Sequence, residues 1–280
     1  MYTTGLNSVD LCFVVDVTGS MGGFIQQAQK HLLDALNELT RLTQVDLHCG
    51  LVEYRDHPPQ DNSFVTRVSA LTGDFKRVES YIKKLSPQGG GDGPEAVYDG
   101  VVAACTQIKW RPTSYRLVVL VGDAPPHGYP LPASDERQPR RQHLQRPVKM
   151  DGDAWPNGCP CGSTIRSVTA EAEAKMITIH GLLMGGCVYA RAAFSELATF
   201  TGGTCSTVQG SVIDVIVSQL KQEFEGLAFD QQVLNVLVQS PLALIGEISE
   251  QLQAPRQRVA RSVARLGKRG FLYQLAMNVS

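Results

Sequence analysis

Three oxygen-bearing side chains follow one apolar stretch near the start of the sequence. Leu11–Val15 leads into Asp16, and Thr18 and Ser20 follow at alternate positions, giving the pattern D-x-T-x-S. Carboxylate and hydroxyl oxygens are hard ligands, which suit Mg²⁺ or Mn²⁺ better than zinc. Because hydroxyl groups alone hold such ions poorly, the pattern predicts a divalent-cation site only if further carboxylates converge on it.

Two further carboxylates occur where such a site needs them. Glu95 follows the glycine-rich segment GGGDGP, and Asp123 ends the apolar run LVVLVGD. On its own, D-x-T-x-S is equally typical of a helix N-terminus, where Asp, Thr and Ser are favoured capping residues. The presence of Glu95 and Asp123 favours the metal site over the cap.

The surrounding sequence predicts a doubly wound α/β fold. Apolar or alternating runs predict strands at 9–16, 45–56, 64–71, 115–123, 177–185 and 203–208, with 64–71 at an edge. Helical spacing predicts helices at 24–42, 73–85, 96–108, 163–176, 190–202 and 211–224. This alternation indicates right-handed crossovers and a mainly parallel sheet covered on both faces. Ligands of such sheets bind beyond the carboxyl ends of the strands, where Asp16 and Asp123 are expected.

These motifs together resemble those of a known family. From Val9 to Phe224 the chain resembles a von Willebrand factor A domain, whose metal-ion-dependent adhesion site (MIDAS) opens with D-x-S/T-x-S. DLCFVVDVTGSMGG matches that motif, GGGDGPE resembles the integrin β-subunit version of the second, and VGDAPPHG resembles the third, D-A-x-x-H. With VEYRDH, the set is most similar to A domains that accompany some α-kinases and to bacterial relatives.

The resemblance implies a ligand set and a mode of action. Thr18 and Ser20 would coordinate Mg²⁺ (or Mn²⁺) directly, Asp16 and Asp123 directly or through water, and Glu95 would complete the site. Asp92 matches an aspartate that helps integrin β subunits hold an adjacent cation, and His127 would support the site loop. However, Gly22 and Gly23 stand where integrins carry an acidic pair, which argues against an adjacent ion. In the family, a carboxylate of a partner protein completes the coordination.

Other chemistry fits the sequence less well. A haloacid-dehalogenase phosphatase needs a second carboxylate at the position of Thr18. GGGDG lacks the G-K-[ST] of a phosphate loop. In the long loop 125–162, His127, His143, Cys159 and Cys161 could ligate zinc, but C-x-C is a poor chelating turn, so incidental thiols are the favoured interpretation. DGDAWPNG, which contains Asp153, is interpreted as a surface turn rather than a calcium loop.

The last part of the chain differs in character. From residue 227 on there are six Lys/Arg against three Asp/Glu, whereas the rest has 20 against 24. Its pattern of three helices, a turn at Ala254-Pro255 and a strand in GFLYQL resembles a winged helix-turn-helix, so we divide the chain into 1–226 and 227–280. The third helix would be the recognition helix. Its basic residues could bind DNA or an acidic protein: Arg256, Arg258, Arg261, Arg265, Lys268 and Arg269.

Composition limits the remaining classes. The chain has 280 residues and 43% hydrophobic content, which is enough for a substantial core. Its net charge of −1 gives no strong sign of nucleic-acid or membrane binding. Seven cysteines without framework spacing indicate reduced thiols. The first residues do not follow the pattern of a signal peptide, and the sequence has no apolar run of the ~18–20 residues that a membrane span needs. We therefore expect a cytoplasmic, non-enzymatic adaptor that binds an acidic partner through a metal and touches no membrane, with a DNA-binding regulator as the alternative.

Overall fold

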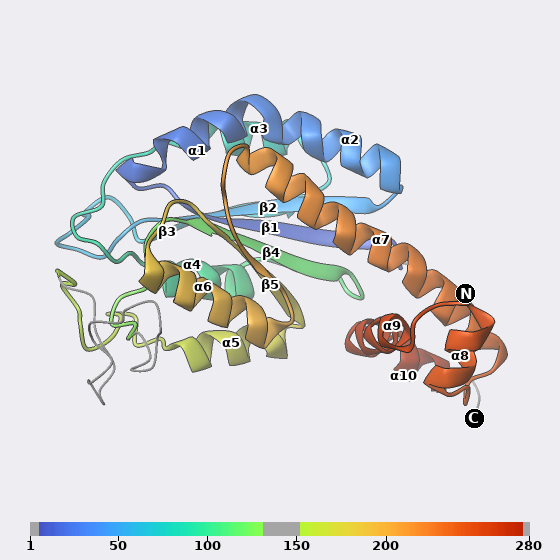
Figure 1. The fold of residues 1–280 in the computed structure, drawn as a ribbon. Helices are drawn as coiled ribbons and strands as arrows, with labels where there is room; N and C mark the ends of the chain where they lie inside the picture. Colours follow the sequence, from blue (N-terminus) through green and yellow to red (C-terminus); the bar gives the residue numbers. More distant parts are fainter. Residues whose placement is uncertain (1–5, 131–151, 277–280) are drawn as a thin grey trace.

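The computed structural model describes residues 6–130 and 152–276, and the described part contains a six-stranded sheet (Figure 1). The strand order is β3-β2-β1-β4-β5-β6, in which only the β2–β3 pair is antiparallel. The strands are β1 Ser8–Asp16, β2 Asp46–Tyr54, β3 Thr66–Thr72, β4 Tyr115–Gly122, β5 Ile177–Leu183 and β6 Cys205–Thr207. The predicted doubly wound, mainly parallel sheet with 64–71 at its edge is confirmed.

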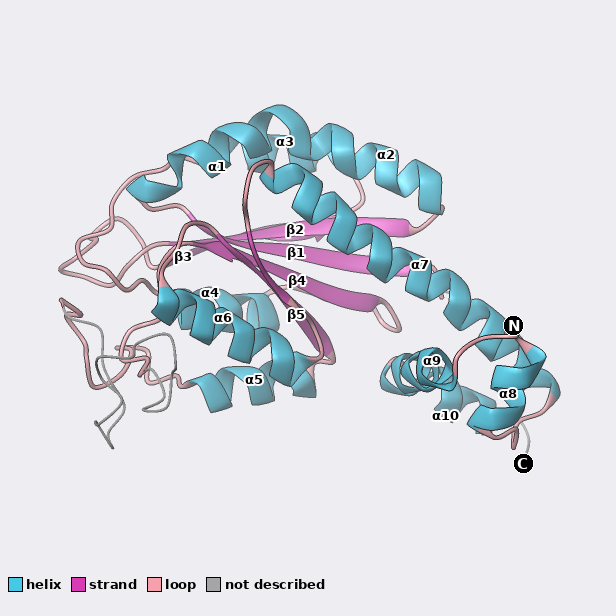
Figure 2. Ribbon diagram, in the orientation of Figure 1, coloured by secondary structure: helices cyan, strands magenta, loops and turns pink. Residues whose placement is uncertain are grey.

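Helices cover both faces of the sheet (Figures 1 and 2). One face carries α1 Gly22–Gln27, a π-helical turn Ala28–Leu32, α2 Leu33–Thr43, α3 Phe75–Lys84 and the first half of α7 Val212–Gln239. The opposite face carries α4 Val97–Gln107, α5 Ile165–Ala174 and α6 Val188–Thr201. Helices α1, α2 and α3 lie on one face and α4 lies on the other, and the strand order reverses between β1 and β4. Doubly wound folds bind their ligands at such a switch point.

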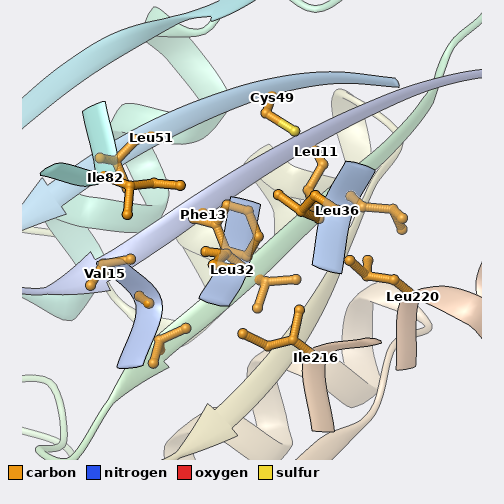
Figure 3. Close-up of a cluster of buried hydrophobic side chains, with 14 of the residues drawn as sticks. Leu11, Phe13, Val15, Leu32, Leu36, Cys49, Leu51, Ile82, Ile216 and Leu220 are labelled. Atoms are coloured by element: carbon orange, nitrogen blue, oxygen red, sulfur yellow. The ribbon is translucent and has the colours of Figure 1, made fainter. Parts of the chain in front are cut away.

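Strand β1 is buried on both faces of the sheet, which explains why its sequence is almost continuously apolar. Leu11, Phe13 and Val15 are directed into the core beneath α2 and α7, where Figure 3 shows them with Leu36, Ile216 and Leu220. The intervening Cys12 and Val14 belong to the core on the other face. Since helices cover both faces, side chains on either side of the strand lose contact with solvent, and a sequence that alternated apolar and polar residues would bury polar groups.

The C-terminal residues form a small helical group beside the sheet, at the right of Figure 1. It comprises the end of α7, α8 Ile245–Gln251, α9 Arg256–Lys268 and α10 Phe271–Ala276. Helix α7 runs without a break across residues 226 and 227. The α/β core uses α7 residues up to Leu227, and a separate core begins at Phe229. The core therefore changes within one helix, not at a linker.

The expected strand in GFLYQL is wrong, because this segment forms α10. Phe271 and Leu275 are both buried in the C-terminal core, while Tyr273 is exposed. Their spacing of four residues places them on one face of a helix, whereas a strand would also place Tyr273 on that face. The described residues after α9 therefore have no wing strand.

The C-terminal helices dock at the amino ends of the strands. Arg269 donates hydrogen bonds to the carbonyl oxygens of Thr113, just before β4, and Leu6, just before β1, at 3.0 and 2.8 Å. Tyr115, at the start of β4, donates to Glu223 of α7 at 2.7 Å. These contacts place the C-terminal helices at the end of the sheet opposite to Asp16. Among the described helices, none combines the length and apolar character needed to cross a membrane.

Candidate metal centre

The loop after β1 gathers the three side chains of D-x-T-x-S. The Thr18 backbone N–H and hydroxyl both donate to Asp16 Oδ1, at 2.8 and 2.6 Å, and the Thr18 and Ser20 hydroxyl oxygens lie 3.4 Å apart. Asp16 and Thr18 are buried, whereas Ser20 is exposed. Asp16 Oδ2 is buried with no hydrogen-bond partner. The loop thus presents a free carboxylate oxygen and two hydroxyls, one of them at the surface.

Glu95 is held beside this loop by backbone contacts. Its N–H donates to the carbonyl oxygen of Pro125 at 2.9 Å, which ties it to the loop after β4. Gly90 lies between Glu95 and Thr18: a Cβ added there would be 2.8 Å from Glu95 Oε1 and 3.3 Å from Thr18 Cβ. Gly90 also has φ +83°, so glycine is required both for backbone conformation and for space.

Asp123 directly follows β4, the strand that pairs with β1. A Cβ added at the preceding Gly122 would lie 3.4 Å from Asp16 Cβ and 2.4 Å from the Tyr54 hydroxyl. Burial raises the pKa of Tyr54 well above its usual value, and the charges of Asp16, Glu95 and Asp123 raise it further. The buried tyrosine therefore lies among all three carboxylates, at the carboxyl ends of β1, β2 and β4.

Backbone hydrogen bonds join the loops that carry these residues. Val17 donates to Tyr54 at 3.0 Å and accepts from Gln88 at 3.0 Å, so the β1 loop is bonded to the end of β2 and to the glycine-rich loop. Gly19 donates to Gly89 at 3.2 Å. The glycine-rich loop is therefore a backbone support for the D-x-T-x-S loop.

The electrostatics of the site favour a bound cation. Burial, followed by repulsion from Asp16 and other carboxylates, raises the pKa of Glu95 to about 10. Burial also raises the pKa of Asp16 to about 7 against the opposing hydrogen bonds from Thr18. Glu95 Oε2, like Asp16 Oδ2, is buried without a hydrogen-bond partner. Because a divalent cation would satisfy both oxygens and relieve the repulsion, these residues fit the metal that the sequence predicted.

A second group of charged side chains adjoins the first. His127 Nε2 lies 2.7 Å from Asp56 Oδ1, and its Nδ1 lies 3.0 Å from Asp153 Oδ1. Asp92 accepts a hydrogen bond from the Ala154 N–H at 2.7 Å. One carboxylate oxygen each of Asp56 and Asp92 and one ring nitrogen of His127 are close enough to share an ion. Burial would lower the pKa of His127, but the hydrogen bonds and charges of Asp56 and Asp153 raise it overall.

Sequence reasoning missed Asp56 and the burial of the Asp153 side chain. The described residues 152–158 form a largely exposed turn, as expected, but the Asp153 side chain within it is only 2% exposed and accepts the Gly128 N–H at 2.7 Å. Asp56 follows the carboxyl end of β2, and that position was the available signal. His127 links Asp56 after β2 to Asp153 of the later loop, and its support of the metal-site loop stays a prediction.

Part of the chain is similar in sequence to known proteins. Residues 10–134 match the family model of the von Willebrand factor A domain. The chain is 37% identical over 123 residues to the alpha-protein kinase vwkA of Dictyostelium discoideum, and the aligned region covers 43% of this chain and 19% of that protein. It is 33% identical over 119 residues to an ariadne-like RING finger protein of Acanthamoeba polyphaga mimivirus, covering 42% and 11%. The chain thus spans less than a fifth of the length of these curated relatives.

Solved structures share the von Willebrand factor A fold at low sequence identity. The pilus adhesin SpaC of Lactobacillus rhamnosus GG, in its open conformation, has a TM-score of 0.52 and 12% identity, covering 78% of this chain and 30% of that one. Proximal thread matrix protein 1 of the mussel byssus, with a zinc-occupied MIDAS motif, has a TM-score of 0.50 and 11% identity, covering 78% and 45%. At these sequence identities, the similarity shows a shared fold and carries no information about function.

The predicted basic site on α9 divides into two groups. Arg256, Arg258, Arg261 and Lys268 are exposed. Arg265 instead makes two hydrogen bonds to the fully buried Asp230, at 2.9 and 2.7 Å. Arg269 is only 6% exposed and bonds to backbone carbonyls near the strands. Arg265 and Arg269 were therefore wrongly assigned as nucleic-acid contacts, because the Arg265 guanidinium binds α9 to α7 and that of Arg269 binds the segments before β1 and β4.

Proposed function

We propose that the chain is a divalent-metal-dependent protein-interaction module. The observation that carries the proposal is the pair of buried, unpartnered carboxylate oxygens on Asp16 and Glu95, beside the Thr18 and Ser20 hydroxyls. The residues that would hold the ion are Asp16, Thr18, Ser20, Glu95 and Asp123. Their donors are all oxygen, which favours Mg²⁺ or Mn²⁺.

The partner proposed for the metal is an acidic side chain of another protein. A bound Mg²⁺ would supply a Lewis-acidic position at which water exchanges for a carboxylate oxygen. Ser20 is exposed, so the ion would lie at the surface where such a side chain can reach it. The match to the von Willebrand factor A domain and the zinc-occupied MIDAS of the mussel protein support this mode of binding. The proposal assigns no catalytic residue.

Residues 227–280 would provide a second interaction surface. They dock at the amino ends of the strands, whereas the metal centre lies at the carboxyl ends, so two partners could bind without competing. Helices α8 and α9 are joined by a short turn, which supports a helix-turn-helix arrangement, although the described residues after α9 form α10 and no wing strand. All seven cysteines are unpaired, which supports a reducing compartment such as the cytoplasm.

The test is affinity capture from the native source in Mg²⁺ and in EDTA, with the wild-type chain and two variants. Asp16→Ala removes a proposed ligand, and Asp34→Ala removes an exposed aspartate of α2 as a matched control. A protein captured in Mg²⁺ by wild type and Asp34→Ala, and lost in EDTA and with Asp16→Ala, would support the proposal. Unchanged capture in EDTA would contradict it.

DNA binding through α9 is the second candidate, carried by the exposed Arg256, Arg258, Arg261 and Lys268. It requires affinity that falls with salt and is reduced by Arg261→Glu in a gel-shift titration. Affinity that is equal in wild type and Arg261→Glu would exclude this helix as the contact.

A further inference from the structure

A third polar cluster lies on the α4 side of the sheet, and the proposed function does not use it. It consists of His57 from the loop after β2, Asp99 from the first turn of α4, and Cys159 and Cys161 from the loop before α5. His57 and Cys159 are buried, Asp99 is largely buried, and Cys161 is exposed. Residues from three distant parts of the chain therefore meet at one point.

The potential ligand atoms face one another at short distances. His57 Nε2 lies 3.0 Å from Asp99 Oδ2 and 3.3 Å from Cys159 Sγ, and the last two atoms are 3.2 Å apart. Cys161 Sγ lies 3.0 Å from Cys159 Sγ. Zinc bond lengths of 2.0–2.3 Å place tetrahedral ligand atoms about 3.3–3.8 Å apart. The separations among His57, Asp99 and Cys159 need to widen by less than about 1 Å to reach those values. Cys161 contacts Cys159 but lies outside this group of three, so its exposed side chain would turn toward His57 and Asp99 to complete the tetrahedron.

The arrangement differs from that of a catalytic cysteine. In a nucleophile–histidine–carboxylate relay, the imidazole uses one nitrogen for the nucleophile and the other for the carboxylate. Here Asp99 and Cys159 both face the same nitrogen, Nε2 of His57. Donor atoms that converge on one point suit a cation better than a proton relay.

The geometry points to a structural zinc site formed by His57, Asp99, Cys159 and Cys161. Thiolate and imidazole ligands select zinc over Mg²⁺, which separates this site chemically from the all-oxygen metal centre. Four protein ligands close the coordination shell, as in structural rather than catalytic zinc sites. The earlier interpretation of Cys159 and Cys161 as incidental thiols considered the wrong histidines: His127 bonds to Asp56 and Asp153, and His143 lies outside the described residues.

The position of the site gives it a mechanical role. The same loop that carries Cys159 carries Asp153, which orients His127, and Ala154, which donates to Asp92. Trp155 packs edge-on against His57 and His127, with ring centroids 5.7 and 4.7 Å apart. Zinc would fix this loop to β2 and α4, and would thereby hold the group of charged residues beside the metal centre.

Metal analysis of the full chain purified without chelator tests the inference. We expect one zinc ion per chain in wild type. Asp16→Ala should keep this ion; because the variant lacks a ligand of the oxygen site, the retained zinc would be bound elsewhere. Cys161→Ser should lower the zinc content to near zero, whereas Cys187→Ser, a control at a half-buried cysteine outside the cluster, should keep it. Cys161 is exposed, so its replacement leaves the core intact.

Cobalt substitution gives a readout that the wild-type protein alone can already fail. Co²⁺ bound to wild type should show a thiolate-to-cobalt charge-transfer band and the visible spectrum of a tetrahedral ion, and the band should weaken in Cys161→Ser. Wild-type protein without zinc and without this band would overturn the site. So would zinc content and a cobalt spectrum that Cys161→Ser leaves unchanged, or a Cys159–Cys161 disulfide in protein purified under reducing conditions.

Discussion

At the residue scale, the metal centre is a set of carboxylates placed where they repel one another. Asp16 and Glu95 are 0% and 4% exposed, and each keeps an oxygen without a partner. Such an arrangement destabilises the folded chain unless protons or a cation neutralise it. The same feature therefore weakens the metal-free protein and makes the centre suitable for a cation.

The pH dependence of the metal-free protein follows from Glu95. Its pKa is about 10 in the folded chain and about 4.3 in the unfolded chain. Since the folded pKa is the higher one, the stabilising contribution is complete below the unfolded pKa and is lost as pH rises towards 10. In EDTA, Glu95→Gln should therefore raise the free energy of unfolding at pH 8 by at least about 1 kcal/mol, and by much less at pH 5.

Denaturant unfolding at the two pH values measures this difference. Adding Mg²⁺ should stabilise the wild type and leave Glu95→Gln almost unchanged, because the variant lacks a proposed ligand. A Glu95→Gln chain that is equally stable to wild type at both pH values would mean that Glu95 does not lie in a repulsive cluster.

Gly90 gives a second residue-scale prediction. Gly90→Ala would force a side chain into a left-handed backbone conformation and against Glu95 Oε1. We expect a loss of about 1–2 kcal/mol in stability and weaker Mg²⁺ binding by calorimetry. Gly23→Ala is the control, since a Cβ there meets nothing within 4 Å and the residue lies in α1. Equal Mg²⁺ affinity in both variants would contradict the assigned role.

Some residues of the centre were predictable from sequence, and others were not. Asp16, Thr18, Ser20 and Asp123 follow strands directly, so the strand pattern alone locates them. Asp153 and Cys159 lie in a loop without periodicity, and their partners His127 and His57 are 26 and 102 residues away in sequence. Such pairings depend on tertiary packing, which local patterns do not encode.

At the element scale, α7 and α9 are joined by one buried ion pair. Arg265 of α9 binds the fully buried Asp230 of α7 through two nitrogens and also donates to the Gly226 carbonyl oxygen at 3.1 Å. Removing one member of such a pair leaves an uncompensated buried charge. The arginine therefore matters for the docking of α9 rather than for contact with DNA.

Arg265→Met should consequently cost about 3–5 kcal/mol in stability, measured by denaturant unfolding. Arg261→Met on the same helix is exposed and should change stability by less than about 0.5 kcal/mol. Similar small effects of both substitutions would show that the ion pair does not hold α9.

The element scale also shows where sequence patterns are ambiguous. GFLYQL is rich in residues that favour strands, yet it forms α10 because Phe271 and Leu275 reach the same core. Continuous α7 was read as two helices because its apolar content extends into two different cores. Short segments take the structure that buries their apolar residues, and that depends on neighbours distant in sequence.

At the scale of the whole molecule, the sheet separates two functional ends. The residues of the proposed metal centre lie at the carboxyl ends of β1, β2 and β4, and the C-terminal helices lie at the amino ends, at the right of Figure 1. Helix α7 contributes to both cores and links them. This arrangement would allow the proposed adaptor to bind partners at opposite ends of the sheet.

Titration of the chain with Mn²⁺, followed by electron paramagnetic resonance, tests the central claim directly, because the signal of the free aqueous ion falls as the ion binds. We predict one bound Mn²⁺ per wild-type chain that excess Mg²⁺ displaces, and affinity at least about 100-fold weaker in Asp16→Ala. Asp34→Ala should bind like wild type. A wild-type chain that binds no Mn²⁺, or an Asp16→Ala chain that binds it equally well, would contradict the assignment of the metal centre.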